Sequence, residues 1–138
     1  MKKRLIKNLL LVALMVVLCL TVGMTASALE PTGQCGDNVY WTFDEPTGEL
    51  VISGEGEMRN YTVSPFKSGE YTIKKITIEE GVTSIGNYAF QNCANVKSID
   101  IPDSVTYIGE RAFSCCGDIG SIYISKNVKG LHNCIEFK

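Results

Sequence analysis

Isoleucine and valine recur at fixed spacings between residues 73 and 124, and the pattern repeats along the chain. Residues 76–98 and 99–121 align without a gap, and ten positions of this 23-residue period are identical. The identical pairs are Ile76/Ile99, Ile78/Ile101, Val82/Val105, Thr83/Thr106, Ile85/Ile108, Gly86/Gly109, Ala89/Ala112, Phe90/Phe113, Cys93/Cys116 and Ser98/Ser121. A fixed period of this length is typical of solenoids, in which each repeat forms one coil that stacks on the next.

Each repeat opens with an apolar motif of the form I-x-x-I-x-I, whose three copies begin at Ile73, Val96 and Ile119. Motifs of this form open the strand of a leucine-rich repeat. Because successive side chains of a strand point to opposite faces, the apolar positions are expected to face inward. The predicted core consists of Ile76, Ile78, Val82, Ile85, Phe90, Ile99, Ile101, Val105, Ile108, Phe113, Ile122 and Ile124.

The second half of each repeat predicts a turn and a short helical segment. Gly86 and Gly109 are expected to adopt a positive φ at the turn, which glycine does at little cost. Residues 88–93 and 111–116 are then predicted to form about one helical turn each. The expected fold class is therefore an α/β repeat protein that is mostly β, with 23-residue coils.

The segment before the repeats predicts a β-hairpin over residues 38–53. Val39, Trp41 and Phe43 alternate with polar residues, residues 44–48 are rich in turn formers, and the alternation then resumes. Because the first coil of a solenoid exposes its apolar interior, the hairpin is expected to cap it. In the alternative interpretation, Trp41 forms an aromatic platform for a sugar.

Three regions are predicted along the chain. Residues 1–28 read as a signal peptide, residues 29–72 as the hairpin cap and a degenerate first coil, and residues 73–138 as the repeats. The last coil departs from the pattern, so it is either a C-terminal cap or a truncated array.

The N-terminal region has a basic start, an apolar run over residues 9–22 and the small residues Ala26-Ser-Ala28. This order is typical of a secretory signal peptide, with cleavage expected after Ala28. The apolar run is shorter than the roughly 20 residues needed to span a bilayer. The prediction is therefore a secreted or surface-exposed protein with no membrane insertion after cleavage.

The charge balance of the remaining chain is acidic. Four of the 13 basic residues and none of the 15 acidic residues lie in the signal peptide. Because nucleic acids and anionic membranes attract basic surfaces, neither is an expected partner.

Five of the six cysteines lie beyond the signal peptide. Cys93 and Cys116 share a repeat position, so we interpret them as small buried residues. A disulfide involving Cys115 and Cys134, or one containing Cys35, would be compatible with export, but the sequence does not define the connectivity. Because the number is odd, one thiol is expected to be unpaired or to pair between chains.

Segments 81–93 (GVTSIGNYAFQNC) and 101–113 (IPDSVTYIGERAF) closely resemble the BspA-like leucine-rich repeats of bacterial surface and secreted proteins. Segments 35–43 (CGDNVYWTF) and 48–58 (GELVISGEGEM) are similar to the module that often precedes those repeats. The resemblance implies a short right-handed solenoid with parallel strands on one face. It also implies adhesion to a host or extracellular protein, and it carries no catalytic residues, metal or cofactor.

Three functional hypotheses remain open. The first is an extracellular protein-binding module, whose strand face would present Lys75, Thr77, Glu79, Asp100, Tyr123 and Ser125. The second is a structural spacer or fragment that self-associates or supports a larger surface assembly. The third is the glycan-binding module at Trp41. Catalysis is not expected, because the only histidine, His132, lies in the degraded last coil and no glycine loop suited to phosphate is present.

Overall fold

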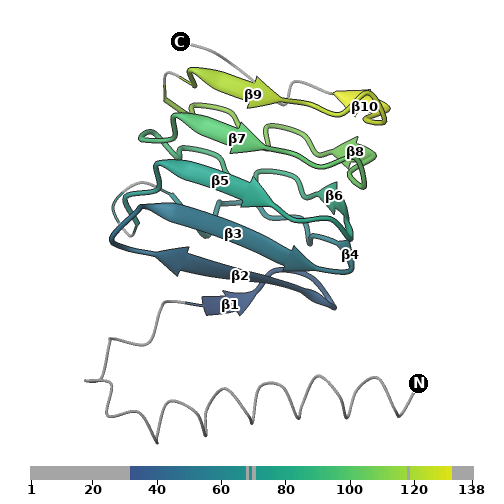
Figure 1. The fold of residues 1–138 in the computed structure, drawn as a ribbon, viewed down its shortest axis with the longest axis horizontal. Coiled ribbons are helices and arrows are strands. Elements are labelled where there is room, and N and C mark those ends of the chain that lie inside the picture. The colour runs from purple at the N-terminus through teal and green to yellow at the C-terminus, as the bar shows by residue number, and fades with distance from the viewer. Residues whose placement is uncertain (1–31, 68, 70, 118, 132–138) are drawn as a thin grey trace, which may run out of the picture.

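The computed structural model describes residues 32–67, 69, 71–117 and 119–131. The predicted signal peptide and the chain end at 132–138 lie outside the described residues. The described chain forms a mostly β solenoid of about three turns, with a large six-stranded sheet and a small four-stranded sheet (Figure 1).

The large sheet has the strand order β1-β2-β3-β5-β7-β9. Its strands are β1 (Thr32–Gln34), β2 (Val39–Asp44), β3 (Glu49–Gly54), β5 (Lys75–Ile78), β7 (Ser98–Asp100) and β9 (Ser121–Tyr123). The strands from β3 to β9 are parallel, and Ile76 of β5 pairs with Leu50 of β3 and Ile99 of β7. Ile99 pairs in turn with Ile122. Equivalent positions of successive repeats are therefore neighbours in the sheet.

The small sheet lies on the other side of each coil (Figure 1). Its order is β10-β8-β6-β4, and all its pairs are parallel. Its strands are β4 (Gly56–Glu57), β6 (Val82–Ile85), β8 (Tyr107–Ile108) and β10 (Gly130–Leu131). Each coil thus contributes one strand to each sheet.

The segment predicted as a hairpin contains β2 and β3, which pair antiparallel with Trp41 opposite Ile52 and Phe43 opposite Leu50. The turn between them closes through the Gly48 N–H, which donates to the Asp44 carbonyl at 2.8 Å. Because β3 also pairs parallel to β5, the same strand completes the hairpin and begins the solenoid.

The helical turns predicted at 88–93 and 111–116 are wrong, since the described residues contain no helix. Tyr88, Asn92, Arg111 and Cys115 have positive φ values between 52° and 64°. A left-handed residue at every fourth position prevents a right-handed helix from propagating. The segments are instead strings of tight turns.

The N–H groups of these turns alternate between two kinds of partner. Three of them donate within the coil to the carbonyl three residues earlier, at 3.3 Å: Ala89 to Gly86, Gln91 to Tyr88 and Cys93 to Phe90. The three between them donate to the next coil at 2.8–2.9 Å: Tyr88 to Glu110, Phe90 to Ala112 and Asn92 to Ser114. The turn is therefore hydrogen-bonded both to itself and to its neighbour.

The positive φ predicted for Gly86 and Gly109 is also wrong, because neither residue is in the left-handed region. Both positions are glycine because the coils touch there. A Cβ on Gly86 would overlap the Arg59 carbonyl oxygen, and one on Gly109 would lie 2.6 Å from Asn87 Oδ1. A larger side chain at either position would push neighbouring coils apart.

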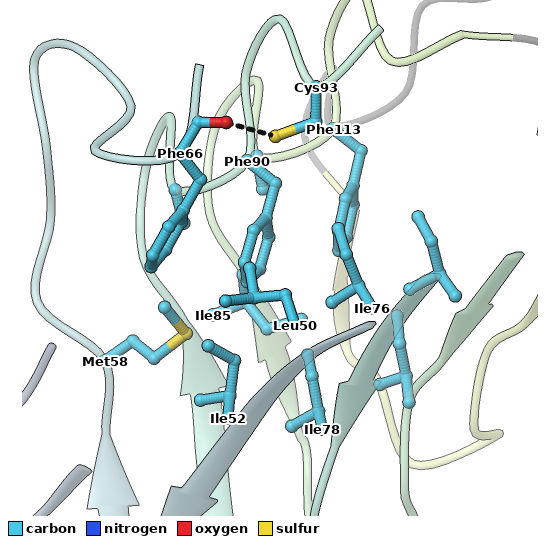
Figure 2. Packing of buried hydrophobic residues seen from close by; sticks show 14 of the residues in the cluster. Leu50, Ile52, Met58, Phe66, Ile76, Ile78, Ile85, Phe90, Cys93 and Phe113 are labelled. Carbon is cyan, nitrogen blue, oxygen red and sulfur yellow. Dashed lines mark hydrogen bonds between the residues drawn. The ribbon is translucent and has the colours of Figure 1, made fainter. Parts of the chain in front are cut away.

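The core runs between the two sheets and along the row of turns. Phe66, Phe90 and Phe113 form a stacked column, with ring centroids 5.6 and 5.3 Å apart (Figure 2). Ten of the twelve predicted core residues are buried, and Ile122 and Ile124 are partly buried in the last described coil. Full burial of such side chains contributes about 1.5–3 kcal/mol each, so the column holds successive coils together.

Candidate functional site

The outward face of the large sheet carries mostly polar side chains in two rows across parallel strands. One row runs from Glu49 through Lys75 to Ser98 and Ser121. The next row consists of Val51, Thr77, Asp100 and Tyr123. Because the inward positions are filled by the apolar core, these rows are the positions of the sheet that a partner can reach.

Lys75 lies at the centre of this face and joins three strands. Its Nζ is 3.2 Å from Glu49 Oε1 on β3 and 3.2 Å from Asp100 Oδ2 on β7. The Thr77 hydroxyl also donates to Glu49 Oε1, at 2.6 Å. The groups are solvent-exposed, so the ion pairs add little stability. They place one positive charge between two negative charges on the surface.

The pKa values at this cluster follow from its hydrogen bonds. The hydrogen bond from Thr77, and then that from Lys75, lowers the pKa of the Glu49 carboxyl. Hydrogen bonds to Glu49 and Asp100 raise the pKa of Lys75. Both groups therefore stay charged near neutral pH, and the cluster keeps its ion pairs there.

A hollow of about 400 Å³ opens beside this cluster, where the strands β5, β7 and β9 end. Tyr123 borders it and is 64% exposed, which is more than any other large hydrophobic side chain of the described residues. The hollow is lined by Ile78, Glu80, Asp100, Ile101, Pro102, Asp103 and Tyr123. It combines an apolar floor with carboxylates and an exposed aromatic ring.

The structure brings four of the six predicted binding residues onto neighbouring strands: Lys75, Thr77, Asp100 and Tyr123. Glu79 is exposed and directly follows β5. The assignment of Ser125 is wrong, because this residue is buried at 2% exposure. Its hydroxyl accepts a hydrogen bond from the Asn127 N–H at 3.1 Å, so it stabilises a turn and is withdrawn from the surface.

The sequence interpretation overlooked Glu80, Pro102 and Asp103 at this hollow. Glu80 and Asp103 occupy the same position of successive repeats, two residues beyond the strand motif. Repeat alignment could have placed them beside each other. It could not have shown that they line the same hollow as Tyr123.

A second hollow, of about 300 Å³, lies on the small sheet. It is lined by Glu57, Met58, Asn60, Thr83, Ser84, Ile85, Thr106 and Tyr107. Tyr107 is 44% exposed. This hollow was not predicted, because it depends on side chains that differ between the repeats.

Cys93 and Cys116 are buried, and each contacts the preceding coil in the same way. The Cys93 thiol donates to the Phe66 carbonyl at 3.2 Å (Figure 2), and the Cys116 thiol donates to the Phe90 carbonyl at 3.1 Å. A hydrogen bond with Cys116, together with burial, raises the pKa of Cys93. Cys93 therefore stays protonated, and both cysteines serve as buried structural residues.

The disulfides considered for Cys35 and Cys115 are not formed in the structure, where both are free thiols. Cys35 is buried and Cys115 is exposed. Cys134 lies outside the described residues. Cys115 is consequently the accessible thiol of the described chain.

Trp41 does not stand free as a platform. Its ring makes edge contacts with Phe66 at 5.4 Å and with Tyr71 at 5.7 Å between centroids. The edge strand β1 covers it further, since a Cβ on Gly33 would lie 2.7 Å from Trp41 Cε2. Packing thus occupies part of the ring surface that a sugar would need.

No cluster of three or more potential metal ligands occurs among the described residues. His132, the histidine of the chain, lies outside them. Within the same described part, no helix is long and apolar enough to cross a membrane.

Comparisons with known proteins agree with this architecture. A model described as "BspA type Leucine rich repeat region (6 copies)" matches residues 64–135, just over half of the chain. No curated protein matches.

Among solved structures, the chain is similar to the crystal structure of a leucine-rich repeat protein from Eubacterium ventriosum, with 28% sequence identity and a TM-score of 0.66. The match covers 74% of this chain and 28% of the other, so this chain spans little more than a quarter of that protein's length. The recurring turns, the stacked phenylalanines and the family match lead to one conclusion. The chain belongs to the BspA-type leucine-rich-repeat family.

Proposed function

We propose that the protein is an exported, non-catalytic module that binds another extracellular protein through the outward face of its large sheet. The family and the repeat fold support a protein-interaction role. The observation that carries the choice of surface is Tyr123, 64% exposed beside the hollow of about 400 Å³.

The chemistry of this surface suits protein recognition. Tyrosine is enriched among the residues that dominate binding energy, because it buries a large rigid area and keeps a polar tip. Ile78 and Ile101 give the hollow an apolar floor, while Asp100 pairs with Lys75 at its edge. A partner side chain that enters the hollow would therefore meet both an apolar surface and polar groups.

An extracellular setting is part of the proposal. It rests on the signal-peptide pattern of residues 1–28, and BspA-type repeats are often found on bacterial surfaces. Adhesion to a host or matrix protein fits both features. The hairpin is proposed to cap the first coil, because Trp41 packs on Phe66 there.

The experiment measures binding of the purified protein to immobilised extracellular-matrix and mucosal proteins by surface plasmon resonance. Tyr123→Ser should weaken any detected interaction about tenfold, because a central aromatic contact is lost. Tyr40→Ser, which removes an exposed tyrosine from β2, separated from Tyr123 on β9 by the three strands β3, β5 and β7, is the matched control and should bind normally. If no panel protein binds the folded protein, or if both variants bind equally, the proposal is wrong.

A second candidate is self-association, which the exposed thiol of Cys115 favours. Non-reducing electrophoresis and light scattering of the same sample separate it from the first. A disulfide-linked dimer that disappears in Cys115→Ser would support self-association. A monodisperse monomer in both samples would remove its support.

A further inference from the structure

The hollow on the small sheet arises from the register of three strands. Glu57 of β4 pairs with Ser84 of β6, and Ser84 pairs with Tyr107 of β8. All three side chains project from the same outward side, and the middle one is the shortest. The small serine between two long side chains leaves the space of about 300 Å³. The other repeat has tyrosine at the serine position, so this gap belongs to one place in the array.

The walls of the hollow carry both donors and acceptors. Asn60 Oδ1 accepts a hydrogen bond from the Asn87 N–H at 2.8 Å, which orients the amide and leaves its NH₂ group as a donor. The Thr106 hydroxyl donates to the Thr83 carbonyl at 3.4 Å, so its oxygen remains an acceptor. Glu57 adds an exposed carboxylate, which accepts hydrogen bonds.

An aromatic ring borders the same space. Tyr107 is 44% exposed on the short strand β8. Its strand pair with Ser84 places it directly beside the gap. A ring in this position offers an apolar face next to groups that form hydrogen bonds.

We propose that this hollow binds a neutral pyranose ring of a glycan. One face of the sugar would stack on Tyr107, while its hydroxyls would bond to Glu57, Asn60 and Thr106. The site is separate from the protein-binding face of the large sheet, so neither proposal depends on the other.

Other ligand classes fit the hollow less well. The eight lining residues include a carboxylate and no lysine, arginine or histidine, so an anion would be repelled. An apolar ligand would desolvate the hydroxyl, amide and carboxylate groups without replacing their hydrogen bonds. The volume lies at the lower end of small-molecule sites, which suits a single ring.

The experiment follows amide resonances of the ¹⁵N-labelled protein by NMR during titration with glucose, galactose, mannose and N-acetylglucosamine. Saturable shifts are expected at residues lining the hollow for at least one of these sugars, with millimolar affinity. The acidic sugars N-acetylneuraminic acid and N-acetylmuramic acid form a second arm and should bind about tenfold more weakly. Absence of saturable shifts with all four neutral sugars, or shifts centred on the large sheet or on Trp41, would overturn the proposal.

Variants test the named contacts. Tyr107→Ala should reduce affinity about tenfold through loss of stacking, whereas Tyr123→Ala on the large sheet should leave it unchanged. Ser84→Leu should abolish sugar binding, because the larger side chain fills the gap. Ser98→Leu, on the other sheet, is its matched control and should bind sugar normally. Glu57→Gln removes the negative charge of the hollow, so it should reduce the difference in affinity between neutral and acidic sugars. Full affinity in folded Tyr107→Ala and Ser84→Leu would rule the site out.

Discussion

At the residue scale, the column formed by Cys93 and Cys116 shows why one residue type recurs at one repeat position. The space holds a small side chain, and the phenylalanine carbonyl of the preceding coil accepts a hydrogen bond from it. A thiol meets both requirements, because it packs as a small apolar group and still donates a weak hydrogen bond. The cysteines of this column are thus explained by packing, without reference to redox chemistry.

Cys35 gives a prediction about the dependence of stability on pH. Burial raises the pKa of the Cys35 thiol from the ordinary value of 9.0 to about 11, although the positive charge of Arg59 lowers it in part. Between pH 9 and 11 the thiol is ionised in the unfolded state but still protonated in the folded state. The stability that Cys35 contributes is therefore fully present below pH 9 and is lost as the pH rises toward 11. Urea unfolding at a series of pH values should show this fall. Burial raises the pKa of Tyr61 to about 12, which adds a loss at still higher pH.

The control for this prediction is Cys35→Ala, which removes the titrating group. Its stability should depend less steeply on pH between 9 and 11 than that of the parent protein. Equal slopes in the two proteins would show that Cys35 does not cause the effect.

At the element scale, the row of turns around Phe90 is held by two alternating sets of hydrogen bonds. One set closes each turn and the other joins it to the next coil. The phenylalanine rings stack directly inside these turns (Figure 2). Backbone pairing and side-chain packing therefore stabilise the same contact between coils.

Phe90→Ala should lower the free energy of unfolding by about 3–5 kcal/mol. The ring is fully buried between Phe66 and Phe113, so its loss leaves a cavity in the middle of the column. Chemical denaturation followed by circular dichroism measures the change. Val63→Ala, at a position that is 61% exposed, is the control and should stay within about 0.5 kcal/mol of the parent. Similar values for both variants would contradict the packing argument.

At the scale of the whole molecule, the hairpin and the solenoid share β3 and an aromatic contact. Trp41 and Phe43 project from β2 onto the first coil, where their rings meet those of Phe66 and Tyr71. Solenoid stability depends on contacts between neighbouring units and on the units that cover the ends. The hairpin and the coils are consequently expected to unfold together.

Trp41→Ala should destabilise the entire protein by about 2–3 kcal/mol, less than for a fully buried tryptophan because the ring is half-buried. A single unfolding transition shifted to lower urea, seen alike by circular dichroism and tyrosine fluorescence, is expected. Tyr40→Ala, which alters an exposed residue of the same strand, is the control. Two separate transitions, or no shift, would show that the hairpin does not cap the solenoid.

The sequence predicts best where the two repeats agree. The identical apolar positions, such as Ile76 and Ile99, become neighbours in the core because alignment in the sequence becomes alignment in the sheet. The sequence predicts helical turns in these segments because a helical turn and a string of tight turns can both use hydrogen bonds between residues three apart. The tight turns differ from a helix in the positive φ of Tyr88 and Arg111. Neither tyrosine nor arginine favours a positive φ, so the residue types do not predict it.

The candidate surfaces were only partly predictable, for a related reason. Lys75, Asp100 and Tyr123 could be found from strand alternation alone. The inward position of Ser125 depends on a local turn, and the hollow near Ser84 depends on which side chains of different repeats meet. Because such positions vary between coils, the repeat pattern contains no information about them.

The alternating hydrogen bonds of the turns have a consequence for how the gene can change. The carbonyls of Asn87 and Ala89 accept hydrogen bonds from the preceding coil, and the carbonyls at the same positions of the next repeat, Glu110 and Ala112, do the same. A tandem duplication of the 23 codons for residues 76–98 would therefore add a coil whose bonds match those already present. The solenoid can therefore gain or lose whole repeats while the hydrogen bonds between coils stay the same. Side chains that later differ between the copies would create new surface hollows.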